Sequence, residues 1–147
     1  MSNDVFIEAC KSGDISVIER YIREGGDPSD YDNAAIRWAS NYGHTEVVKL
    51  LLSDRRVDPS DDNNATIRWA SKYGHTEVVK LLTNDERVDP SADSNYAIQW
   101  ASVNGHIDIV KLLLEADRVI MKGIALGQEG VLDYISSERE RKIKELV

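Results

Sequence analysis

The stretch that decides the fold is AIRWASNYGHTEVVKLLL, residues 35–52, which returns as TIRWASKYGHTEVVKLLT from residue 66 and as AIQWASVNGHIDIVKLLL from residue 97. The spacing is constant, because Trp38, Trp69 and Trp100 follow one another at steps of 31 residues. A fixed period of about 20–50 residues is typical of a solenoid, in which copies of one supersecondary unit stack on each other. The sequence therefore predicts a stack of repeats.

Each repeat is predicted to hold a finger-like turn and two helices. The turn is written DPSDYDN, DPSDDNN or DPSADSN, and its asparagine is placed to cap the helix that follows. The first helix, AAIRWAS in the first internal copy, is expected to end near Gly43, because glycine suits a left-handed helix stop. The second helix, TEVVKLLL, has a single polar stripe, so it must be buried both by its partner helix and by the neighbouring repeats.

The amino-acid pattern of the two helices resembles the ankyrin repeat, whose usual form is TPLHLAA-x-x-GH-x-x-VV-x-LLL. The resemblance implies an all-α, ankyrin-type helix-turn-helix solenoid with short finger-like hairpin loops. The repeats here are shorter than the usual length of about 33 residues, and AAIR, residues 34–37, replaces the TPLH box. Such short repeats are similar to those of ankyrin proteins from large DNA viruses that infect amoebae.

The repeat frame makes residues 1–147 a single ankyrin-repeat domain. Glu8 and Lys122 replace the tryptophan of the internal copies, as expected at the two ends of a stack. The last helix is expected to continue into a charged helical tail, SSERERKIKELV. The predicted parts are an N-terminal capping repeat at 1–27, internal repeats at 28–58, 59–89 and 90–117, and a C-terminal capping repeat with the tail at 118–147.

Composition and charge narrow the function classes. The net charge is −8, which repels phosphate backbones and disfavours a nucleic-acid partner. A single cysteine, Cys10, cannot form an internal disulfide. No apolar run approaches the ~18 residues of a membrane span, and the N-terminus lacks a signal pattern. These features predict an intracellular, cytoplasmic monomer (in the host cytoplasm if the chain is viral) with no membrane partner.

Metal sites are not expected. Zinc ligands lie ~2 Å from one ion, whereas His44, His75 and His106 occupy equivalent places in repeats that stack roughly 8–10 Å apart. We expect each histidine to bond a loop instead. The oxygens of Asp58, Ser60, Asp62 and Asn64 alternate as in a calcium-binding EF-hand loop. However, the glycine and the closing glutamate of that loop are missing, which favours turn formation.

No catalytic residue is identified, and no cofactor or small-molecule substrate is expected. Ser40, Ser71 and Ser102 fall at the small-residue position where the helices approach closely, and Cys10 falls at the same position of the first unit. Core packing is the preferred interpretation of all four. The tryptophans are open to two interpretations, an inter-repeat core or a strip that faces a partner. Their absence from both caps favours the core.

The resemblance implies that the finger tips and the exposed side of each first helix form a concave face that binds a protein partner. Tyr42 and Tyr73 are the best anchor candidates, because tyrosine is enriched at binding hot spots. The finger aspartates favour a partner with a basic surface. The predicted face consists of Tyr31, Asp32, Arg37, Asn41 and Tyr42, then Asp62, Asn63, Arg68, Lys72 and Tyr73, then Asp93, Ser94, Gln99, Val103 and Asn104.

The sequence thus predicts a non-catalytic protein–protein interaction module. A rival hypothesis is an adaptor that recruits a host protein to a ubiquitin ligase through the C-terminal segment ERERKIKELV. The enzyme hypothesis is disfavoured, because no nucleophile, phosphate loop or paired acid and base is present.

Overall fold

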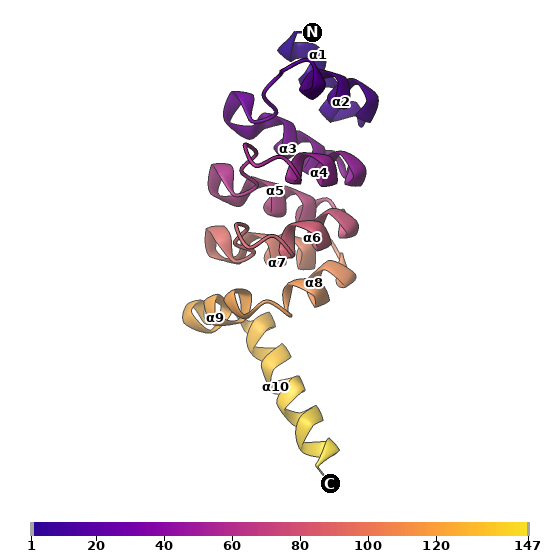
Figure 1. The fold of residues 1–147 in the computed structure, drawn as a ribbon. Coiled ribbons are helices and arrows are strands. Elements are labelled where there is room, and N and C mark those ends of the chain that lie inside the picture. The colour runs from indigo at the N-terminus through magenta and orange to yellow at the C-terminus, as the bar shows by residue number, and fades with distance from the viewer. Residues whose placement is uncertain (1, 147) are drawn as a thin grey trace.

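The computed structural model describes residues 2–146, which form helix pairs stacked side by side along one axis (Figure 1). This part of the chain contains ten helices and no strand, so the predicted all-α solenoid is confirmed. The helices are α1 (Asn3–Ser12), α2 (Ile15–Arg23), α3 (Asp30–Tyr42), α4 (Thr45–Leu52), α5 (Asp61–Lys72), α6 (Thr76–Thr83), α7 (Ala92–Val103), α8 (Ile107–Leu113), α9 (Asp117–Leu126) and α10 (Glu129–Glu145).

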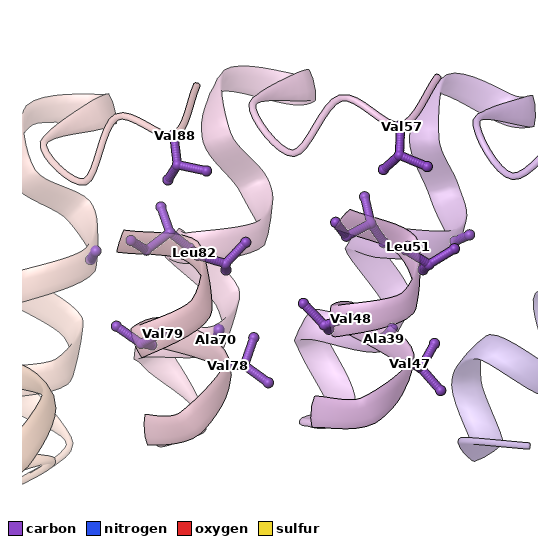
Figure 2. Packing of buried hydrophobic residues seen from close by; sticks show 14 of the residues in the cluster. Ala39, Val47, Val48, Leu51, Val57, Ala70, Val78, Val79, Leu82 and Val88 are labelled. Carbon is purple, nitrogen blue, oxygen red and sulfur yellow. The ribbon is translucent and has the colours of Figure 1, made fainter. Parts of the chain in front are cut away.

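The core runs the length of the stack between the first and second helices. Val47, Val48 and Leu51 of α4 are at most 2% exposed, and Leu82 occupies the place of Leu51 one repeat later (Figure 2). Residues at four-residue steps, such as Val47 and Leu51, lie on one helix face, and Val48 turns toward a second face. Because both faces are apolar, each second helix packs against its own first helix and against the next repeat.

Histidine and glycine lock successive repeats together. The His44 Nε2 lies 2.7 Å from the carbonyl oxygen of Lys11, and the His75 Nε2 lies 2.7 Å from that of Asn41. Each imidazole also covers a glycine of the preceding repeat, so that a Cβ on Gly13 would overlap the ring of His44. This glycine has φ 80°, in the left-handed region. The histidines therefore bond to the backbone, but their partners are carbonyls in the last turn of the first helix of the preceding repeat and not in a loop as predicted.

The fingers are single turns of left-handed helix. Tyr31, Asp32 and Asn33 have φ of 58°, 53° and 59°, and the same conformation returns in the next two fingers. The Asn33 N–H donates to the Ser29 carbonyl at 3.0 Å, which closes the turn. Asp and Asn tolerate this region better than other side chains because their short polar groups bond locally.

The finger asparagine does not cap the helix that follows it, contrary to the prediction. Its side chain instead forms a hydrogen bond with the backbone of the next finger. The Asn33 Oδ1 accepts the Asp58 N–H at 2.7 Å, and the Asn64 Oδ1 accepts the Asp89 N–H at 2.8 Å. Both asparagines are less than 10% exposed. A buried amide that satisfies a backbone N–H of the neighbouring repeat couples the fingers along the stack.

The C-terminal end departs from the regular stack. After α9 the chain forms α10 as one continuous helix, which confirms the predicted helical extension, and this helix points away from the other pairs (Figure 1). Ser40 and Ser71 are fully buried as predicted, but Ser102 is exposed. The prediction for Ser102 is therefore wrong, because the last helix pair, α9 and α10, does not pack on α7 and α8 as closely as the internal pairs pack on one another. Among residues 2–146, no helix has both the length and the apolar character that a bilayer span requires.

Candidate protein-binding face

The predicted binding residues lie on the finger tips and on the solvent side of α3, α5 and α7, which we call the first-helix face. Tyr42 and Tyr73 are about half exposed, and Val103 is 75% exposed. Arg37, Asn41, Arg68 and Lys72 are half-buried at the base of the face. The remaining predicted residues are exposed, namely Tyr31, Asp32, Asp62, Asn63, Asp93, Ser94, Gln99 and Asn104.

The arginines of this face form hydrogen bonds with the backbone of the fingers. The Arg68 guanidinium donates to the backbone carbonyls of Asn63 and Asp62 at 3.0 and 3.1 Å. It also lies 3.7 Å from the Asp93 carboxylate of the next finger. Arg37 repeats the arrangement one unit earlier, 3.7 Å from Asp62. Because these donors are already engaged, the two arginines shape the fingers and leave the neighbouring tyrosines as the accessible anchors.

The tryptophans lie on the first-helix face, so the preferred inter-repeat core interpretation holds only in part. Trp38 packs against the core, but none of the three tryptophans is fully buried. Trp38 is half-buried, and Trp100 is 38% exposed. In two of the repeats the tryptophan precedes a tyrosine by four residues. This spacing places the two side chains on one side of the helix. The Trp38 and Tyr42 rings stack with centroids 5.9 Å apart, and those of Trp69 and Tyr73 stack at 6.1 Å.

Tyr96 joins two repeats into one aromatic cluster. This residue occupies the position that is alanine in the other internal copies, and its ring meets Trp69 edge-on at 6.2 Å and Trp100 at 5.8 Å. We call the four rings of Trp69, Tyr73, Tyr96 and Trp100 the aromatic cluster. The sequence signals that could have found it are the four-residue Trp–Tyr and Tyr–Trp spacings, together with the Ala-to-Tyr change in the third copy.

Lysines lie over these rings. The Lys11 Nζ is 4.4 Å from the centroid of Trp38. The Lys72 Nζ is 4.5 Å from Trp100 and 5.3 Å from Trp69. In each case the lysine comes from the repeat before the tryptophan that it covers most closely. An ammonium group over an aromatic face is attracted by the ring quadrupole, so the stems and rings are held together at the surface.

The chemical groups outside this face have structural roles. Burial raises the pKa of the Cys10 thiol to about 12, so the thiolate needed for nucleophilic chemistry is suppressed at neutral pH. The Asp58 Oδ1 accepts both the N–H and the hydroxyl of Ser60, at 2.9 and 2.7 Å, which confirms the predicted turn-forming role. Within the described residues, no three His, Cys, Asp or Glu side chains gather into a group that could hold a metal ion.

Comparison with protein families agrees with the stacked helix pairs. A family model described as ankyrin repeats (3 copies) matches the chain twice, at residues 6–94 and 55–123. The chain belongs to the ankyrin repeat family. No curated protein matches it. Ankyrin repeats are generally protein–protein interaction modules, and this ankyrin repeat protein presents its exposed aromatic rings on the side where the resemblance predicts binding.

Proposed function

We propose that this ankyrin repeat protein binds a protein partner through its first-helix face and performs no chemistry of its own. The observation that carries the proposal is the aromatic cluster, in which Tyr73 and Trp100 stay 48% and 38% exposed although large rings gain most from burial. Contiguous exposed aromatic surface marks interaction sites, and tyrosine and tryptophan are enriched at their hot spots.

The charge of the face refines the expected partner. Asp62 and Asp93 already lie near an arginine of the preceding repeat, whereas Asp32 forms no ion pair within residues 2–146. A basic group of the partner is therefore proposed only beside Asp32 and Tyr31, at the first finger. The similarity to viral ankyrin proteins, the cytoplasmic location and the monomeric state stay predictions.

Affinity capture from a cell lysate tests the proposal. The wild-type protein is compared with the double variant Tyr42→Glu/Tyr73→Glu, which places a charge on each stacked Trp–Tyr pair. We expect the double variant to lose the proteins captured by the wild type, because a buried carboxylate without a partner opposes association.

The matched control is Ser53→Glu/Asn84→Glu. These two exposed residues follow α4 and α6 and have the same 31-residue separation and the same change of charge as the tyrosine pair. The control is expected to retain the captured proteins. Loss of the same proteins from both variants, or from neither, would show that the first-helix face is not the binding site.

A second candidate function is recruitment of a ubiquitin ligase through the tail. The observation in its favour is that α10 stands apart from the stack (Figure 1). Ile143 of this helix is 54% exposed. If the tail recruits a ligase, deletion of residues 138–147 removes ligase subunits from the captured proteins and leaves the unfolding transition unchanged. A truncated protein that unfolds would instead identify the segment as a cap.

A further inference from the structure

Lys72 lies in the middle of the first-helix face and has no carboxylate partner among residues 2–146. Its ammonium group lies near three rings of the aromatic cluster, at 4.5 Å from Trp100, 5.3 Å from Trp69 and 5.7 Å from Tyr73. Lys11, the other lysine over a tryptophan, is paired with Glu8 at 3.4 Å. Lys72 forms no ion pair within residues 2–146, although the chain carries an excess of acidic groups.

Lys72 differs from the other charged residues and the equivalent positions of this face. Arg37 and Arg68, the other cations of the internal repeats on this face, are bonded to finger carbonyls and face finger aspartates. The positions equivalent to Lys72 are Asn41 in the preceding repeat and Val103 in the following one. Within the described residues, Lys72 is therefore the unpaired ammonium group of α3, α5 and α7 on this face. It is half-buried among aromatic rings, where pairing with an anion is less screened than on an open surface.

The repeat spacing sets the form of a matching ligand. Neighbouring first helices pack roughly 8–10 Å apart, and an extended chain advances about 3.3 Å per residue. About three residues of an extended segment therefore pass from one repeat to the next. Because the Lys72 ammonium lies 4.5 Å from Trp100, a residue paired with it also lies beside the Tyr96–Trp100 pair on α7. A side chain about three residues to one side would reach the Trp38–Tyr42 pair on α3.

We propose that the partner contributes an extended segment that crosses α3, α5 and α7, with an Asp or Glu carboxylate on the Lys72 ammonium. An apolar side chain about three residues to one side packs on the Trp38–Tyr42 pair, and side chains next to the carboxylate pack on the Tyr96–Trp100 pair. This inference rests on the proposed function and assigns the chemistry of the partner. Charge complementarity carries it, because Arg37 and Arg68 on this face lie near finger aspartates, whereas Lys72 forms no ion pair within residues 2–146.

Selection from a displayed library of random peptides tests the inference. Peptides of about 12 residues are long enough to cross four repeats at about three residues each. The library is selected on the wild type, on Lys72→Glu and on the neutral variant Lys72→Gln. The matched control is Lys49→Glu, because Lys49 is exposed on α4 and the change of charge is the same. Circular dichroism confirms that each selected protein is folded.

The wild type and Lys49→Glu are expected to enrich peptides with an Asp or Glu and an apolar side chain about three residues to one side of it. The best of these peptides should bind Lys72→Glu at least about tenfold more weakly and Lys49→Glu equally well. Lys72→Gln should lose the preference for Asp and Glu. If Lys72→Glu fails to fold, the Lys72→Gln result decides.

Other outcomes separate this inference from the proposed function. Peptides that lack acidic residues, yet lose binding to Tyr42→Glu/Tyr73→Glu, would overturn the role of Lys72 and keep the first-helix face as the site. Failure of the wild type to enrich any peptide would overturn the extended segment. Peptides that bind the tyrosine double variant as well as the wild type would overturn both the inference and the proposed site.

Discussion

Replacement of Asn64 with alanine is expected to lower the free energy of unfolding by about 2–4 kcal/mol. Asn64 has φ 59°, where alanine costs more than asparagine, and its side chain is only 9% exposed. Its Oδ1 accepts the Asp89 N–H at 2.8 Å, so the substitution also leaves a backbone donor of the next finger without its partner. Urea-induced unfolding followed by far-ultraviolet circular dichroism measures the change.

Asn63 provides the control for this prediction. Its φ is 52°, in the same left-handed turn, but the residue is exposed and its side chain makes no hydrogen bond within residues 2–146. Asn63→Ala should therefore cost only the backbone part, about 1–2 kcal/mol. Equal losses from Asn63→Ala and Asn64→Ala would contradict the assignment of the Asn64 side chain as a link between fingers.

Replacement of Gly43 with alanine is expected to cost about 2–5 kcal/mol. Gly43 has φ 76°, and the added Cβ would overlap the imidazole of His75 from the next repeat. The ring would have to move away from its hydrogen bond with the carbonyl of Asn41. The substitution therefore adds steric overlap and a lost inter-repeat bond to the strain of the left-handed backbone.

Gly105 separates these contributions. It has the same φ of 76°, but a Cβ there would meet no atom within 4 Å. Gly105→Ala should thus show the backbone strain alone, about 1–2 kcal/mol, in the same unfolding measurement. Equal destabilisation by Gly43→Ala and Gly105→Ala would show that the contact between histidine and glycine does not hold the repeats together.

The fold is largely predictable because its signals are local and repeated. Gly43 closes a first helix in the left-handed conformation, as its place after an apolar run indicates. Val47 and Leu51 are buried, as the nearly continuous apolar second helix requires. A stacked repeat contacts only its neighbours, so a pattern read in one copy carries to the next. That rule fails at Ser102, where the following helix pair no longer stacks in the same way.

The candidate face is predictable only in part. Tyr42 and Tyr73 are exposed where the pattern places them, but the tryptophans, which the pattern favours for the core, are at most partly buried. The absence of tryptophan from both capping repeats fits either interpretation. A capping repeat lacks one neighbouring repeat, so it can neither bury a tryptophan against that repeat nor extend an aromatic surface onto it. The orientation of Trp69 depends on Tyr73 and Tyr96, and Tyr96 belongs to a different repeat.

The sequence by itself determines the repeat, the helix pairs, the buried Val-Leu runs and the glycine stops, since each follows from short-range periodicity and backbone preference. Only the tertiary structure decides which side chains make contacts between neighbouring repeats. The Asn33 amide bonds to the next finger, His75 covers Gly43, and the Lys72 ammonium lies between rings of α5 and α7. The physical reason is that each of these side chains can bond locally or across the stack, and only the packed neighbour shows which partner is within reach.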